Sequence, residues 1–175
     1  MSKSNAAPTD SDRTIILLRH GIAEERSADG KDETRRLTTE GRARMREAAR
    51  GLAELFPKVD TIYTSPLLRA VETAQAVAKA YGTKANINTT DVLAPGSDAK
   101  AFRALLDETP HRRAIYVGHE PTLTSFFLAL LGIRNPKGAI ELKKGGGYVV
   151  PIAADGAASL ELVLSPRVLR RLGKR

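Results

Sequence analysis

Short apolar segments alternate with longer amphipathic segments through the first two thirds of the chain, and this alternation is what most constrains the fold. Residues 14–18 (Thr-Ile-Ile-Leu-Leu) form a continuous apolar, β-branched run that is typical of a buried strand. Apolar residues at helical spacing then predict a helix from Thr38 or Thr39 to Phe56, which Pro57 ends. Because strand and helix continue to alternate, the chain is predicted to be an α/β protein with helices on both faces of its sheet.

Further strands and helices continue the pattern toward the C-terminus. The apolar patterns predict strands at residues 59–64, 85–89 and 114–117, and helices from Ser65-Pro66 to Gly82, from Ser97 or Asp98 to Leu106, and from Pro121 to Leu131. Candidate strands at residues 140–142, 148–152 and 160–164 then follow one another with no helix between them. We therefore expect a mostly parallel sheet that ends in antiparallel strands, followed by a basic turn or helix.

No linker divides the chain, so the sequence predicts one domain. A chain of 175 residues is long enough to bury a core of its own. We expect a single three-layer α/β/α domain at residues 14–175 with a basic C-terminal tail. Residues 1–13, which are polar and carry no periodic apolar pattern, are expected to form a flexible leader.

Composition excludes several classes of protein. Apolar residues make up 42% and charged residues 27% of the chain, a balance typical of globular domains. No apolar run approaches the roughly 18 residues that a membrane-spanning helix needs, and the polar N-terminus is unlike a secretory signal. Cysteine is absent, which excludes disulfides and thiolate metal sites. We expect a cytoplasmic protein with no membrane partner.

The positive charge of the chain is concentrated in its second half. The formal net charge is +8, and the last nine residues contain five Lys or Arg and no Asp or Glu. A basic surface attracts anionic partners of many kinds without choosing among them, and it also serves solubility. The composition argues against nucleic acid as a partner, because aromatic residues, which stack on bases, make up only 5% of the chain.

Two histidines and two arginines follow the predicted strands. Arg19, His20 and Gly21 come directly after the first strand, Arg69 lies in the first turn of the helix after the second, and His119 follows the strand at 114–117. Ligands of open α/β sheets bind beyond the carboxyl ends of the strands. Each side chain alone has a structural explanation, but their common placement predicts a shared site at this edge.

The chemistry that this group of residues suits is phosphoryl transfer without a metal or other cofactor. Arginine binds phosphoryl oxygens through two N–H groups at once, and a neutral imidazole is an established covalent nucleophile. Glycine next to each histidine, Gly21 and Gly118, lets the backbone approach a ligand closely.

Four segments resemble the motifs of the histidine phosphatase (phosphoglycerate mutase-like) superfamily. They are residues 18–21 (Leu-Arg-His-Gly), 37–41 (Leu-Thr-Thr-Glu-Gly), 65–74 (Ser-Pro-Leu-Leu-Arg-Ala-Val-Glu-Thr-Ala) and 117–121 (Val-Gly-His-Glu-Pro). Their order and spacing cover nearly the whole chain, and its short length is most similar to the phosphohistidine phosphatase SixA branch. The resemblance implies a phosphoglycerate mutase-like fold.

The resemblance also implies a role for each residue of the group. His20 would be the nucleophile that becomes phosphorylated, and Arg19 and Arg69 would bind the phosphoryl oxygens with Gly21 beside them. His119 would complete the phosphate pocket, and water would then hydrolyse the phosphohistidine. The implied substrate is a phosphohistidine-containing signalling protein, such as a phosphotransfer domain.

The chain departs from larger members of the superfamily at the position of the general acid. The stretch at residues 93–98 (Leu-Ala-Pro-Gly-Ser-Asp) contains no glutamate, and its one acid, Asp98, is better explained as a helix cap. An alkoxide leaving group needs a proton in the transition state, a contribution of about 10²–10⁴-fold. Imidazole leaves more easily, so the gap favours phosphohistidine over phosphomonoesters.

Two alternatives to a phosphohistidine phosphatase stay open. One is a phosphatase for a small phosphorylated substrate, with Asp98 or the loop residues Glu24 and Glu25 as the acid. The other is a basic module that binds polyphosphate or nucleic acid without turnover. The sequence leaves open whether the loop at residues 22–36 moves over the substrate.

Overall fold

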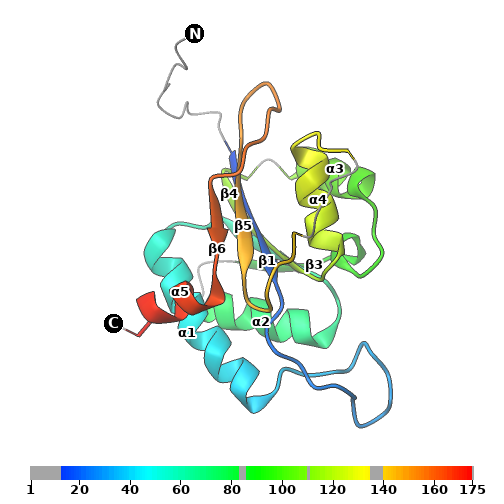
Figure 1. Cartoon of the computed structure of the whole chain (residues 1–175), viewed down its shortest axis with the longest axis vertical. Coiled ribbons are helices and arrows are strands. Elements are labelled where there is room, and N and C mark those ends of the chain that lie inside the picture. The colour runs from blue at the N-terminus through cyan, green and yellow to red at the C-terminus, as the bar shows by residue number, and fades with distance from the viewer. Residues whose placement is uncertain (1–12, 83–85, 110, 135–139, 175) are drawn as a thin grey trace.

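The chain folds into one sheet with helices packed against both faces (Figure 1). The structure, a computed structural model, describes residues 13–82, 86–109, 111–134 and 140–174. The strands are β1 (Arg13–Arg19), β2 (Thr61–Thr64), β3 (Asn86–Thr89), β4 (Arg113–Gly118), β5 (Gly147–Ile152) and β6 (Leu162–Leu164). The helices are α1 (Thr39–Leu55), α2 (Leu68–Ala80), the 3-10 helix η1 (Asp91–Leu93), α3 (Ala99–Glu108), α4 (Thr122–Leu130) and α5 (Pro166–Leu172).

The six strands lie in the order β3-β2-β4-β1-β5-β6. The strands β3, β2, β4 and β1 are parallel, whereas β5 runs antiparallel to β1 and β6 antiparallel to β5. The prediction of a mostly parallel sheet with antiparallel strands at the end is thus confirmed. In the pairing of β1 with β4, Arg19 lies opposite Gly118, so the segments that follow these two strands leave the sheet side by side.

The apolar run of β1 contributes to the core on both faces of the sheet. Ile16 and Leu18 pack in the cluster that includes residues of α1, α2 and α5. Ile15 and Leu17 pack in the opposite cluster, which includes residues of α3 and α4. This alternation explains why a strand covered on both faces is apolar at every position rather than at every second one. Figure 1 shows the two groups of helices on opposite sides of the sheet.

Several predicted elements differ from the structure, among them the strand expected at 59–64, which is shortened to Thr61–Thr64. The helix expected at Ser65-Pro66 begins only at Leu68, with no side-chain cap, because the Ser65 Oγ contacts His119 and accepts the N–H of Leu67, which precedes the helix. Residues 140–142 form no strand, since the Leu142 carbonyl accepts a hydrogen bond from the Arg19 side chain rather than from a neighbouring strand. The strand expected at 160–164 is shortened to Leu162–Leu164.

The predicted flexible leader falls mostly outside the described residues. Of residues 1–13 the structure describes Arg13 alone, which is the first residue of β1. The predicted strand at 85–89 is β3, and its residue 85 also lies outside the described part. Within the described ranges, no helix combines the length and the apolar character that crossing a membrane requires.

The basic C-terminal segment forms α5, which packs closely against α1. A Cβ atom built on Gly51 of α1 would lie 2.0 Å from the Leu169 carbonyl oxygen, and one built on Gly173 would lie 1.9 Å from the Glu47 carbonyl oxygen. The two helices therefore meet through backbone, and only glycine fits at both positions.

Gly51→Ala is expected to destabilise the protein by about 1–3 kcal/mol, because the added methyl group overlaps the backbone of α5. Alanine in place of glycine inside a helix normally stabilises by roughly 0.5–1 kcal/mol, so the sign itself is diagnostic. Urea denaturation measures the change. Glu54→Ala, at an exposed position of the same helix, is the control and should change stability by less than about 0.5 kcal/mol. A stabilised Gly51→Ala protein would contradict the close packing.

Candidate active site

His20 follows directly after β1, where the backbone is held from both sides. The Arg19 N–H donates to the Gly146 carbonyl at 2.8 Å, and the His20 N–H donates to the Gly118 carbonyl at 3.1 Å. The His20 ring is buried, with its Nδ1 2.7 Å from the Gly21 carbonyl oxygen. A carbonyl oxygen only accepts, so Nδ1 carries the hydrogen and Nε2 keeps its lone pair.

Thr73 and Met45 fix the position of Gly21, the residue whose carbonyl orients the His20 ring. The Gly21 N–H donates to the Thr73 Oγ1 at 3.1 Å, and the Thr73 hydroxyl donates to the Arg69 carbonyl at 2.7 Å. A Cβ atom on Gly21 would lie 2.5 Å from Cγ of Met45. Sequence reasoning did not single out Thr73, although a hydroxyl four residues after Arg69 in a helix is placed to bond that residue's carbonyl.

His119 follows β4 and faces His20. The two ring centroids are 5.0 Å apart and the ring planes are inclined at 53°. Its Nε2 lies 2.9 Å from the Ser65 Oγ, which also accepts the Leu67 N–H at 3.3 Å and so has its own hydrogen left for Nε2. The buried Nδ1 of His119 has no partner within the described residues. This arrangement favours a hydrogen on Nδ1, a donor that is free for a ligand.

Each of the two arginines is anchored at one end of its guanidinium. Arg69 is only 5% exposed, and its Nη1 and Nη2 donate to the Asp32 carbonyl at 2.8 Å and to the Asp32 Oδ2 at 2.9 Å. Nη1 of Arg19 donates to the Leu142 carbonyl and lies 3.4 Å from the Glu141 carboxylate. The Nε of Arg19 is buried without a partner in the described part of the chain. Since a guanidinium has five N–H groups, both arginines retain donors for an anion.

Both imidazoles are uncharged at neutral pH. Burial, followed by the proximity of His119, lowers the pKa of His20 from 6.5 to about 3, with smaller effects of Arg69 and Arg19. Burial and then Arg69 lower the pKa of His119 from 6.5 to about 4. An uncharged His20 with a free Nε2 is the form that attacks phosphorus.

These lowered pKa values predict that acid destabilises the fold. Below pH 6.5 the unfolded chain protonates both histidines while the folded chain does not, so the free energy of unfolding falls as the pH falls toward about 4. Each imidazole contributes up to about 1.4 kcal/mol per pH unit. Urea denaturation at several pH values between 7 and 5 gives the slope of the free energy of unfolding against pH. This slope should be smaller in His20→Asn than in the unaltered protein, by up to the contribution of one imidazole. An unchanged slope would contradict the buried, uncharged state.

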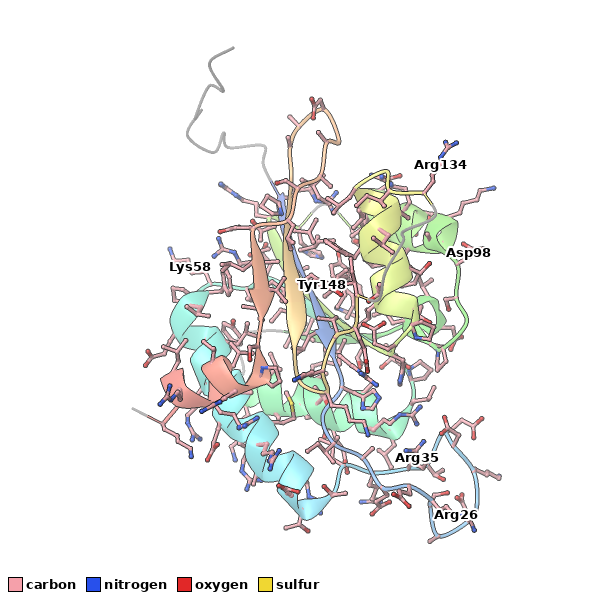
Figure 2. The ribbon with its side chains drawn as sticks, in the orientation of Figure 1. Arg26, Arg35, Lys58, Asp98, Arg134 and Tyr148 are labelled. Atoms are coloured by element: carbon pink, nitrogen blue, oxygen red, sulfur yellow. The ribbon has the colours of Figure 1, made fainter. Side chains whose placement is uncertain are left out.

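The acids that the sequence offered lie apart from this pair of histidines. The Asp98 carboxylate accepts the Ala101 N–H at 2.7 Å as the cap of α3, and Asp98 lies at the surface (Figure 2). Glu24 accepts the Arg36 N–H at 3.2 Å, and Glu25 is exposed. Their observed contacts are those of caps and loop supports, with no contact to His20.

Two acids that sequence reasoning did not select adjoin residues of the candidate site, one through a contact with Arg69 and the other through its place in the chain after His119. Asp32, in the loop at residues 22–36, holds Arg69, and hydrogen bonds first from Arg35 and then from Arg69 lower its pKa. Glu120 follows His119, is half-buried, and has a pKa raised by burial. Its Oε1 accepts the Thr124 hydroxyl at 2.9 Å. Glu120 could have been found from the sequence because it directly follows His119, whereas nothing in the sequence pointed to Asp32.

Comparisons with known proteins agree with this geometry. The model of the histidine phosphatase superfamily (branch 1) matches residues 15–94. A curated but uncharacterized protein of Picosynechococcus sp. is 35% identical over 136 residues, which are 75% of this chain and 81% of that protein.

Solved structures extend the similarity over the fold. The protein histidine phosphatase SixA complexed with tungstate has a TM-score of 0.76 at 22% identity, covering 89% of this chain and 99% of that one. A putative phosphohistidine phosphatase SixA from Nakamurella multipartitia has a TM-score of 0.71 at 26% identity, covering 91% and 99%. A phosphoserine phosphatase from Entamoeba histolytica has a TM-score of 0.70 at 19% identity, covering 90% and 99%. The resemblance read from the four sequence motifs is confirmed: this chain belongs to the histidine phosphatase superfamily.

Proposed function

We propose that the protein hydrolyses phosphohistidine on a signalling protein through a phosphorylated His20. Membership of the superfamily supports a phosphatase. The observation that carries the proposal is the state of the buried His20 ring, which is uncharged and held through Nδ1 so that Nε2 is free. A nucleophile in this form needs no separate base to activate it.

The reaction proceeds in two displacements. Nε2 of His20 attacks phosphorus, the bond from phosphorus to the substrate imidazole nitrogen breaks, and that imidazole leaves with the electron pair and takes up a proton. Water then attacks the phosphorus of phosphorylated His20, the bond to Nε2 breaks, and orthophosphate leaves. In both steps Arg19, Arg69 and Nδ1 of His119 donate to the phosphoryl oxygens, where negative charge is spread in the transition state.

Phosphohistidine is favoured as the substrate because its leaving group is undemanding. Asp98, Glu24 and Glu25 hold caps and loops rather than a leaving group. A site without such an acid loses the roughly 10²–10⁴-fold that proton donation gives to an alkoxide. An imidazole that takes its proton from solvent loses far less.

Glu120 favours a second candidate, a phosphatase for small phosphomonoesters. Its half-buried carboxyl follows His119, and burial raises its pKa toward the range of a general acid. Under this proposal Glu120 would protonate the leaving alkoxide.

The experiment that separates the two candidates measures orthophosphate release from a phosphohistidine-bearing phosphotransfer domain and from phosphoserine. The first proposal expects a strong preference for phosphohistidine and little effect of Glu120→Gln. A preference for phosphoserine, lost in Glu120→Gln, would establish the second candidate. Release from neither substrate would contradict both and leave an anion-binding module.

A further inference from the structure

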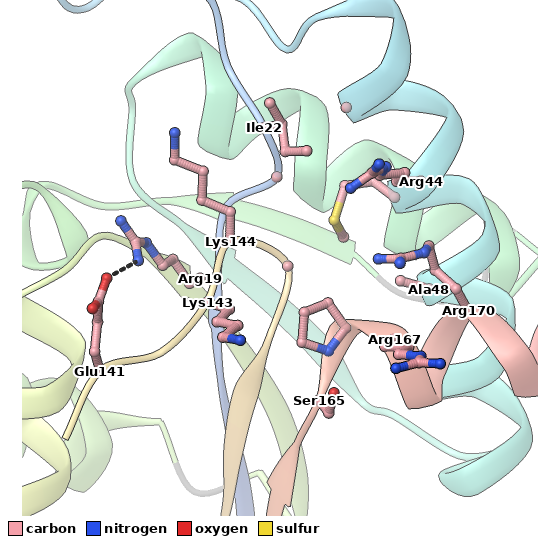
Figure 3. A pocket seen from close by; sticks show the side chains of 15 residues that line it. Arg19, Ile22, Arg44, Ala48, Glu141, Lys143, Lys144, Ser165, Arg167 and Arg170 are labelled. Atoms are coloured by element: carbon pink, nitrogen blue, oxygen red, sulfur yellow. Dashed lines mark hydrogen bonds and ion pairs between the residues drawn. The ribbon is translucent and has the colours of Figure 1, made fainter.

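A basic groove with a volume of about 500 Å³ (Figure 3) lies beside the phosphoryl pocket, the name we give to the candidate site formed by Arg19, His20, Arg69 and His119. We define the basic groove by its five cations: Arg44 of α1, Lys143 and Lys144 of the segment before β5, and Arg167 and Arg170 of α5. Arg19 and Gly21, on either side of His20 in the chain, also line it. The groove is therefore continuous with the site at which phosphate would be transferred.

The lysines of the groove are fixed to the segment that carries the nucleophile. The Gly145 N–H donates to the carbonyl oxygens of both Arg19 and His20 at 3.1 Å. Gly145 has a φ of +78°, which glycine adopts without strain. This turn places Lys143 and Lys144 close in the structure to His20, although they are more than a hundred residues away in the sequence.

The charge of the groove is largely uncompensated. Lys143, Lys144, Arg167 and Arg170 make no ion pair or side-chain hydrogen bond within the described residues. Arg44 pairs with Glu40, and the acid of the lining, Glu141, pairs with Arg19. A group of like charges without partners raises the local concentration of anions.

The form of the groove suits a protein surface better than a small phosphate compound. Buried Met45 and Ala48 form an apolar floor, while Lys143, Lys144 and Arg167 are exposed. Apolar centres with charged, hydrated rims are typical of protein interfaces. None of the five cations of the groove is buried, whereas the guanidinium group of Arg69, which would hold a single phosphate, is.

We propose that the basic groove docks an acidic face of the phosphorylated protein substrate beside its phosphohistidine. This inference rests on the proposed function and names the chemistry of its partner. The cations at the rim accelerate encounter with the acidic face, and the apolar floor accepts apolar side chains from its centre.

The test compares a protein substrate with a small one. Two double variants, Lys143→Gln with Lys144→Gln and Arg167→Gln with Arg170→Gln, are assayed on a phosphohistidine-bearing phosphotransfer domain and on free phosphohistidine. At low salt, kcat/KM for the phosphotransfer domain should fall roughly tenfold in each double variant, mostly through KM, and its dependence on salt should weaken. Turnover of free phosphohistidine should stay within about twofold.

The matched control removes two exposed lysines outside the groove, Lys58→Gln with Lys79→Gln, and should leave both substrates unaffected. Equal losses on both substrates, equal losses in the control, or no loss at all would each overturn the docking proposal while the phosphatase stands. Failure of the unaltered protein on both phosphohistidine substrates would refute the proposed function and the docking proposal together.

Discussion

Phosphate release is expected to fall by at least roughly 10³-fold in His20→Ala, because the change removes the atom that forms the bond to phosphorus. A large loss is expected because within the proposed mechanism no other group attacks phosphorus. The measurement is orthophosphate release from a phosphohistidine-bearing protein. Acid-labile phosphate on the enzyme, trapped by rapid denaturation, should vanish together with turnover.

His111→Ala is the matched control for this loss. His111 is the one histidine of the chain outside the candidate site, and its Nε2 lies 3.2 Å from the Tyr63 hydroxyl. Turnover and the trapped phosphate should be retained in this variant. Turnover preserved in His20→Ala, or lost equally in both variants, would refute the assignment of the nucleophile.

Arg69→Ala is expected to lower kcat/KM by about 10²–10³-fold, with most of the loss in kcat. The change removes a buried cation from the phosphoryl pocket and also leaves the Asp32 carboxylate without that partner, where it repels the anionic substrate. Arg69→Lys should recover only part of the loss, because lysine keeps the charge but not the two parallel N–H groups.

The control for Arg69→Ala is Arg103→Ala, which removes a partly exposed arginine of α3, outside the candidate site. Thermal unfolding of each variant separates a catalytic loss from a folding defect, and only variants that remain folded are compared. A kcat/KM for Arg69→Ala within threefold of the unaltered protein would exclude a role for this guanidinium in the transition state.

The local patterns of the sequence were enough to predict the fold and to bring four candidate residues to one edge of the sheet. The run at residues 14–18 lies within β1, and Thr38 caps α1, because short-range preferences decide both. The convergence of His20 and His119 follows from parallel strands, whose carboxyl ends meet at the same edge.

Contacts between distant segments decided what the sequence did not predict. Ser65 read as a helix cap, but the side chain that it contacts, His119, lies more than fifty residues away. The strand predicted at residues 140–142 rested on apolar side chains, and Leu142 is indeed buried, yet a buried side chain does not supply a hydrogen-bonded neighbour. The contact of Asp32 with Arg69 depends on the path of a long loop, which no periodic pattern encodes.

The position of β1 inside the sheet also determines how the protein would lose its activity. The amides of Arg19 and His20 donate to opposite neighbours of the strand, so their hydrogens exchange with solvent only when the centre of the sheet opens. The loop that carries Asp32 is tied to the domain as well, through the contacts of Asp32 with Arg69 and of the Glu33 carbonyl with the Leu68 N–H. Heat should therefore abolish turnover at the temperature at which the whole domain unfolds, since the nucleophile keeps its place for as long as the native sheet persists.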